Sequence, residues 1–117
     1  MIRFYGYANC STCRKARAYL LQRGLQLNEI DITTTPPPKA LLHSLVSSGH
    51  YSLPELFNRS GQLYRALLLS EKLKGLSLDA QLDLLATHGK LVKRPIITDG
   101  TRHTVGFDAS RMQRIWG

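Results

Sequence analysis

Cys10 and Cys13 are the chain's two cysteines, and they are separated by two residues in the stretch NCSTCRKA. Such a pair can serve as metal ligands, as a structural disulfide or as reactive thiols. A structural zinc site needs four ligands, and the chain has no second cysteine pair and no close pair among its four histidines, so we expect no metal site. A disulfide across so short a loop removes little entropy from the unfolded chain. The reactive pair is therefore the favoured interpretation.

The segments around the pair predict how it is held. Apolar residues alternate from Ile2 to Gly6, which is typical of a short strand. From about residue 11 to 23 the apolar positions follow a helical period instead, and Ser11 or Thr12 can cap the start of this helix. The cysteines are thus expected at the start of a helix that directly follows a strand.

The predicted helix start gives a physical reason for reactive thiols. Cys10 faces the unpaired N–H groups and the positive end of the helix dipole, with Arg14 and Lys15 close by. These groups favour the thiolate and lower the pKa of Cys10, which makes Cys10 the expected nucleophile. Cys13 lies about one turn inside the helix, so we expect it to resolve adducts that form on Cys10.

The same helix start is a candidate anion site. The backbone N–H groups of Ser11, Thr12 and Cys13 can converge on an oxyanion, as they do in phosphate-binding loops. Arg14 adds a positive charge there, and Asn9 is expected to shape the loop before the helix. A thiolate beside an anion site favours the reduction of an oxyanion.

The middle of the chain is predicted to be helical. Apolar residues between 25 and 32 first mark a second strand, which completes a βαβ unit with parallel strands. The stretch from about 36 to 89 then shows mostly helical patterns. We interpret this stretch as a helical insert within a single domain that spans residues 1–117.

The last quarter of the chain is predicted to form a ββα unit. Residues 91–97 are rich in β-branched side chains, Asp99-Gly100 is a hairpin turn signal, and residues 103–105 can pair back. Asp108 is expected to cap a final helix. Tyr5, Tyr7 and Phe107 could line the active site, but their placement beside strand ends favours packing.

Composition narrows the function classes. Sixteen lysines and arginines against eight acidic residues give a net charge of +8, but the basic residues are spread along the chain. Without a basic–aromatic pattern or a known reading module, we expect no direct nucleic-acid binding. The chain lacks a signal pattern and any window of roughly 18 apolar residues. We therefore expect a cytoplasmic monomer. In the cytoplasm, close cysteine pairs are more often catalytic or redox-sensing than structural.

Three stretches carry a resemblance to a known family: FYGYANCSTCRKARAYL, LPELFNRSGQLYRAL and LVKRPIITDGTRHTVGFD. Together they resemble the arsenate reductase (ArsC) and Spx family over essentially the whole chain. This resemblance implies a thioredoxin-like α/β fold. In that fold a βαβ unit and a ββα unit form a four-stranded mixed sheet, with an all-helical insert between the two units.

The resemblance also implies roles for individual residues. The position of Cys10 is that of the family's catalytic or redox cysteine, and Arg94 matches the arginine that helps to hold an oxyanion or a sulfur intermediate. The bond between Arg94 and Pro95 is expected to be cis. Asn58, with Arg59 beside it, falls where glutaredoxin-coupled arsenate reductases have a second arginine.

Two functions follow from this resemblance. The first is an arsenate-reductase-like thiol oxidoreductase that acts on an oxyanion or a disulfide, binds no cofactor and takes electrons from glutathione, glutaredoxin or thioredoxin. Val105, where such reductases have a third arginine, and Cys13, where they usually have no cysteine, depart from this pattern. The second function is a Spx-like redox-sensing regulator, whose disulfide state controls binding to the C-terminal domain of the RNA polymerase α subunit.

Overall fold

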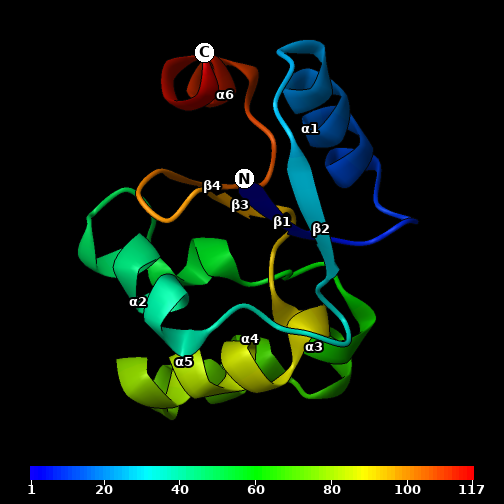
Figure 1. Ribbon diagram of the computed structural model, residues 1–117. Coiled ribbons are helices and arrows are strands. Elements are labelled where there is room, and N and C mark those ends of the chain that lie inside the picture. Colours follow the sequence, from blue (N-terminus) through cyan, green and yellow to red (C-terminus); the bar gives the residue numbers. More distant parts are fainter. The chain divides into compact units, whose positions relative to one another are not determined.

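Figure 1 shows a computed structural model of the protein, which describes residues 1–117. The chain forms two compact units, of which the first combines Met1–Ile32 with Arg94–Gly117 and the second spans Thr33–Lys93. The first unit holds every strand of the sheet, and the second holds the helical segments from residue 39 to 91. The predicted α/β class is confirmed, whereas the single domain with an insert at about 36–89 stays a prediction.

The first unit is built on a four-stranded mixed sheet in the order β2-β1-β3-β4. The strands are β1 (Ile2–Gly6), β2 (Leu27–Asp31), β3 (Ile96–Thr98) and β4 (His103–Val105). β1 runs parallel to β2 and antiparallel to β3, and β3 pairs with β4 as a hairpin. These pairings confirm the βαβ and ββα units and make β1 a central strand.

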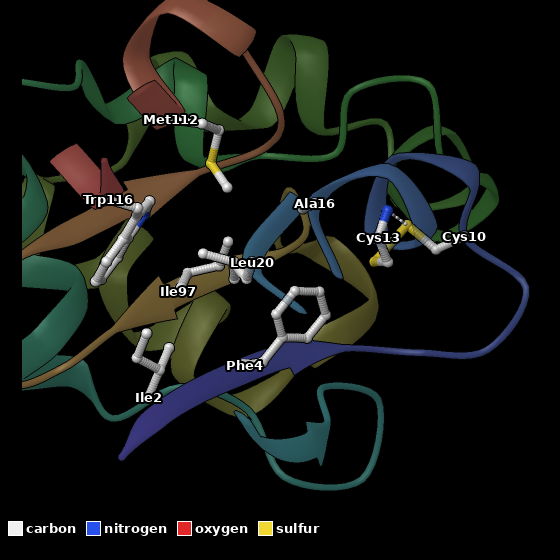
Figure 2. Packing of buried hydrophobic residues seen from close by; sticks show 9 residues of the cluster. All are labelled: Ile2, Phe4, Cys10, Cys13, Ala16, Leu20, Ile97, Met112 and Trp116. Carbon is white, nitrogen blue, oxygen red and sulfur yellow. Dashed lines mark hydrogen bonds between the residues drawn. A yellow bond between two sulfur atoms is a disulfide. The ribbon is translucent and has the colours of Figure 1, made fainter. Parts of the chain in front are cut away.

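Helices α1 (Ser11–Gln22) and α6 (Ala109–Trp116) lie on the same side of this sheet (Figure 1). They cover one apolar core, drawn in Figure 2, whose buried members are Ile2, Phe4, Cys10, Cys13, Ala16, Leu20, Ile97, Met112 and Trp116. α1 contributes Cys13, Ala16 and Leu20, which follow the helical spacing seen in the sequence. Both cysteines are therefore held by the main core of this unit.

The last helix is fixed at both ends. The Asp108 side chain accepts a hydrogen bond from the backbone N–H of Arg111, as expected for a cap. At the other end, the buried indole N–H of Trp116 donates to Thr104 Oγ1 of β4 at 3.0 Å. The polar groups that α6 brings to the core are thus paired.

The second unit consists of short helical segments. They are α2 (Lys39–Ser47), η1 (Leu53–Leu56), α3 (Gln62–Ala66), α4 (Leu69–Lys72), η2 (Leu73–Gly75), α5 (Leu78–Thr87) and η3 (Gly89–Leu91). Helices α2 and α5 lie in contact, and the ammonium of Lys39 pairs with Asp79 and Asp83 at 2.6 and 2.8 Å. No helix of the chain is long and apolar enough to cross a membrane.

The strand predicted over residues 91–97 is wrong in its first half. Leu91 ends a 3-10 turn, Val92 makes only an isolated bridge, and strand β3 begins at Ile96. Pro95 explains the late start, because it has no N–H group to donate to a strand ladder. Arg94 consequently lies outside the sheet, directly before its third strand.

Candidate active site

The loop between β1 and α1 places Cys10 at the N-cap of the helix. Its backbone is extended, and its Sγ atom accepts a hydrogen bond from the backbone N–H of Cys13 at 3.1 Å. The expectation that Ser11 or Thr12 caps the helix is wrong: the preceding residue does so, with sulfur in place of the usual side-chain oxygen. The Cys10 sulfur therefore lies against a backbone N–H group that has no partner within the helix.

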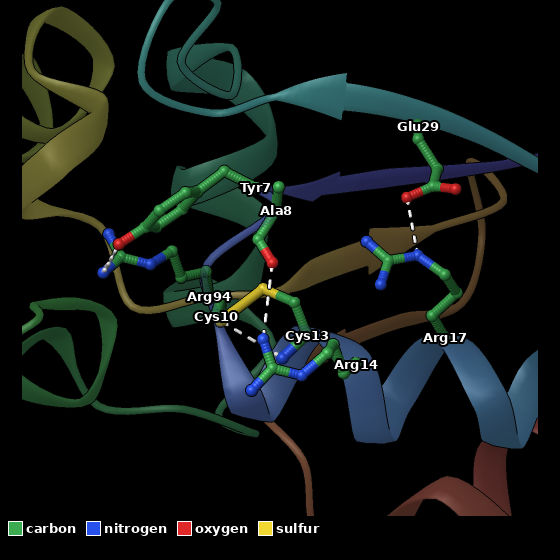
Figure 3. Close-up of a disulfide and its surroundings, with 8 residues drawn as sticks. All are labelled: Tyr7, Ala8, Cys10, Cys13, Arg14, Arg17, Glu29 and Arg94. Carbon is green, nitrogen blue, oxygen red and sulfur yellow. Dashed lines mark hydrogen bonds and ion pairs between the residues drawn. A yellow bond between two sulfur atoms is a disulfide. The ribbon is translucent and has the colours of Figure 1, made fainter.

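Cys10 and Cys13 form a disulfide across the first turn of α1, with their Cα atoms 5.1 Å apart (Figure 3). Cys10 keeps 8% of its surface exposed, whereas Cys13 is fully buried. An incoming thiol must approach from the surface, and of the two residues Cys10 alone keeps any exposed surface. No group of three or more histidines, cysteines or acidic residues forms a candidate metal site.

Gly6, at the end of β1, supports the buried sulfur from behind. A Cβ atom added at Gly6 would lie only 2.9 Å from Cys13 Sγ and equally close to Cε1 of Phe4. Any larger residue would therefore displace the disulfide or the core ring. The alternating pattern predicts only that a strand ends at Gly6, and no local pattern in the sequence signals this contact.

The first turn of α1 is positively charged. It contains Arg14 and Lys15 and no acidic residue, so nothing there opposes the helix dipole. Arg14 reaches back to the loop, where its guanidinium lies 3.5 Å from the carbonyl oxygen of Ala8 (Figure 3). Asn9 and Ser11 are exposed on either side of Cys10, so the predicted anion site is open to solvent.

Arg94 lies against Tyr7 in the same surroundings (Figure 3). Its guanidinium carbon is 4.3 Å from the centroid of the tyrosine ring, and one guanidinium N–H group donates to the tyrosine hydroxyl at 3.3 Å. The Arg94–Pro95 bond is cis, as the family resemblance implied. Tyr7 packs against the core of this unit, as predicted, but no local pattern in the sequence indicates that it also contacts Arg94.

Asn58 and Arg59 belong to the second unit, in the turn between η1 and α3. The backbone N–H of Asn58 donates to the carbonyl oxygen of Leu91 at 2.7 Å, and its side chain packs closely against Gly61. Arg59 is exposed. Asn58 thus has a local structural role, and anion binding by these two residues stays a prediction.

A family model described as "ArsC family" matches residues 5–115, a range that includes the cysteine pair, Tyr7 and Arg94. The chain belongs to the ArsC family. The thioredoxin-like fold predicted from the resemblance is confirmed by solved structures of ArsC-like proteins. Among these, a possible arsenate reductase from Streptococcus mutans UA159 superposes with a TM-score of 0.85 at 38% identity, over 97% of this chain and 98% of the other.

The sequence relatives of this chain include an uncharacterized protein and a transcriptional regulator. The uncharacterized protein YusI of Bacillus subtilis is 46% identical over 113 residues, which cover 97% of this chain and 96% of YusI. The global transcriptional regulator Spx of Streptococcus pyogenes serotype M6 is 27% identical over 97% of this chain and 83% of Spx. The chain is thus similar both to a possible arsenate reductase and to a global transcriptional regulator.

Proposed function

We propose that the protein is a cytoplasmic thiol-dependent oxidoreductase in which Cys10 attacks the substrate and Cys13 resolves the adduct. The observation that carries this proposal is the asymmetry of the pair. Cys10 keeps a small exposed surface and its sulfur accepts a backbone N–H bond at the helix start, while Cys13 is fully buried one turn inside. Such an arrangement separates a nucleophile from a resolving thiol.

Reduction of the disulfide creates the reactive form. The Cys10 thiolate would accept the N–H bond now made to its sulfur, at the positive end of a 12-residue helix with Arg14 and Lys15 in its first turn. Each of these groups stabilises negative charge on the sulfur. The pKa of Cys10 should therefore lie below the value of about 8.5 that is usual for a free cysteine.

With a disulfide substrate the reaction proceeds in two exchanges. The Cys10 thiolate attacks one substrate sulfur, the substrate S–S bond breaks, and one thiolate leaves. The Cys13 thiol loses its proton and attacks Cys10 Sγ, which releases the second substrate thiolate and forms the Cys10–Cys13 disulfide. Two electrons pass from the protein dithiol to the substrate, and the product is the disulfide seen in the structure.

With an oxyanion substrate the same two sulfurs act in the same order. The Cys10 thiolate displaces water from the central atom of the protonated oxyanion, while the N–H groups of Ser11 and Thr12 and the guanidinium of Arg94 stabilise the negative oxygens. Attack of Cys13 on Cys10 Sγ then leaves the bonding pair on the central atom, which is reduced by two electrons. Similarity to a possible arsenate reductase supports this class.

A thiol donor must return the protein to its reduced form. Two glutathione molecules, or the dithiol of a glutaredoxin or thioredoxin, would supply the two electrons through a mixed disulfide on Cys10. The burial of the two residues supports this step, because Cys10 keeps a small exposed surface and Cys13 keeps none.

The test is turnover by the purified protein with a small disulfide and with arsenate, each with glutathione, glutaredoxin or thioredoxin as donor. We expect turnover by the native chain, none by Cys10→Ser, and slower turnover by Cys13→Ser, in which an external thiol must resolve the adduct on Cys10. Arg94→Ala should weaken the oxyanion reaction more than the disulfide reaction. Equal rates for the native chain and Cys10→Ser would contradict the proposal.

A second candidate is a redox-sensing regulator, which the similarity to Spx favours. In this case the Cys10–Cys13 disulfide changes a surface that binds the C-terminal domain of the RNA polymerase α subunit. The measurement is binding of that domain to the oxidised and the reduced protein. Binding by one redox form alone, without turnover with any donor, would replace the oxidoreductase with the regulator.

A further inference from the structure

Four arginines of the first unit lie over aromatic rings. The pairs are Arg17 with Phe4, Arg23 with Tyr19, Arg94 with Tyr7 and Arg102 with Trp116. Three of these arginines also donate to carboxylate or backbone carbonyl oxygens, including those of Glu29, Asp99 and Gly117. Arg94 differs, because the only oxygen that its guanidinium bonds is the phenol oxygen of Tyr7.

The sheet explains why Arg94 meets Tyr7. β1 and β3 are antiparallel, and their last pair is Tyr5 with Ile96. Two residues further along β1 and two residues back along β3, the same register places Tyr7 opposite Arg94. The contact therefore continues the strand pairing beyond its last pair, and the chain that leaves Tyr7 reaches Cys10 three residues later (Figure 3).

This contact leaves most of the arginine's binding capacity free. A guanidinium has five N–H donors, and Arg94 uses one of them for the tyrosine hydroxyl. The ring covers a face of the guanidinium, whereas a carboxylate or oxyanion approaches its edge. Arg94 is also half-buried and has no carboxylate partner, so its charge is uncompensated beside the disulfide.

Holding the arginine in place changes what it can do for a substrate. An unrestrained arginine loses side-chain freedom when it binds an anion, and this loss weakens the binding. Stacking on Tyr7 and the hydroxyl contact restrict Arg94 before the substrate arrives. Disulfides that carry an anionic group should therefore benefit from the pair, and neutral disulfides should not.

We propose that Tyr7 is a positioning residue that holds Arg94 for the anionic part of the substrate, so that the site favours carboxylate-bearing disulfides over neutral ones. This inference rests on the proposed oxidoreductase function and deepens it by naming a substrate class. Tyr7 acts through Arg94, and the reacting sulfur remains that of Cys10.

The test compares two reagents that form a mixed disulfide with one thiol. Dithiobis(nitrobenzoic acid) carries carboxylates, and dithiodipyridine is neutral. The reduced Cys13→Ser protein offers Cys10 as its one thiol, and the measured quantity is the ratio of the two second-order rate constants. We expect Arg94→Ala to lower this ratio about tenfold and Tyr7→Leu about three- to tenfold. Tyr7→Phe keeps the ring and should cost about twofold.

Three further measurements separate positioning from a general effect. Tyr7→Leu should cause no additional loss once Arg94 is alanine, because the tyrosine acts through the arginine. The pKa of the Cys10 thiolate, followed by its ultraviolet absorbance, should be the same with Tyr7 and with Leu at this position. Arg23→Ala is the matched control: it removes another ring-stacked charge, at the end of α1 about 20 Å from Cys10, and should leave the ratio unchanged.

The inference would be overturned if Tyr7→Leu left the ratio of the rate constants unchanged. It would also be overturned if Tyr7→Leu lowered this ratio as much in the Arg94→Ala protein as in the protein that keeps Arg94. If Tyr7→Leu does not fold, Tyr7→Phe decides, and an unchanged ratio in that variant contradicts the inference. Failure of the proposed function looks different, since Cys10 would then react with both reagents no faster than an ordinary free thiol. In that case the inference falls with it.

Discussion

At the scale of single residues, the two sulfur atoms of the disulfide have unlike surroundings. Cys10 lies at the start of α1 with part of its surface exposed, and its sulfur accepts a backbone N–H bond. Cys13 is fully buried in the core, with Gly6 behind its sulfur. The position of the buried Cys13 sulfur thus requires a residue without a side chain at position 6.

Replacing Gly6 should therefore damage both stability and the cysteine pair. The Cβ atom of Gly6→Ala would lie 2.9 Å from Cys13 Sγ, and relieving this clash should cost about 1–3 kcal/mol of the free energy of unfolding. Urea unfolding measures this loss. Gly75→Ala is the matched control, because a Cβ there meets nothing within 4 Å. Equal stability of the two variants would show that Gly6 does not support the sulfur.

The sequence predicted the positions of the two cysteines better than their contacts. The spacing of the cysteines and the helical pattern after them place Cys10 at a helix start without any structure. Two details could not be predicted. Cysteine is not among the usual capping residues, and the contact of Tyr7 with Arg94 joins positions 87 residues apart through strand register.

At the scale of elements, helix α1 depends on Cys10 for its N-terminal cap. Cys10→Ser and Cys10→Ala both remove the disulfide, but serine keeps a side-chain acceptor for the N–H of Cys13. We expect the alanine variant to be less stable than the serine variant by about 1 kcal/mol in chemical unfolding. Identical stabilities would mean that the sulfur does not cap the helix.

The β3–β4 hairpin should make stability depend on pH. Backbone N–H groups of Arg102 and Thr101, together with the Arg102 guanidinium, lower the pKa of Asp99 to about 2 from 3.8. Burial lowers the pKa of His103 below 6.5, and its Nδ1 lies 2.7 Å from the Thr98 hydroxyl. The fold thus favours the ionised Asp99 and the neutral His103.

Both groups stabilise the fold at neutral pH and lose this contribution in acid, because the unfolded chain binds their protons more readily. Stability should fall as the pH drops below about 6.5 through His103, and again between 3.8 and about 2 through Asp99. Unfolding free energies measured across this range test the prediction. His103→Gln should remove the first fall and Asp99→Asn the second; a fall near pH 6 that survives in His103→Gln would contradict the assignment.

At the scale of the whole molecule, periodicity and turn signals predicted the order of strands and helices, and the family resemblance implied the four-stranded mixed sheet. They succeeded where a pattern is local, as in the Asp99-Gly100 hairpin and the stripe of α1. They failed at residues 91–97, where β-branched composition suggested a strand and Pro95 prevents one. Arg94, which precedes β3, meets Tyr7 through the pairing of distant strands and not through the local propensity of its own segment.

The most direct test of the central claim is the mass of the adduct trapped on the reduced Cys13→Ser protein after reaction with a disulfide or an oxyanion. Without Cys13 the first step occurs and the second cannot, so the adduct should accumulate on Cys10, and glutathione or another thiol donor should release it. Cys10→Ser, which keeps the buried sulfur of Cys13, should form none. No adduct on Cys10, or an equal adduct in Cys10→Ser, would contradict the assignment of Cys10 as the nucleophile.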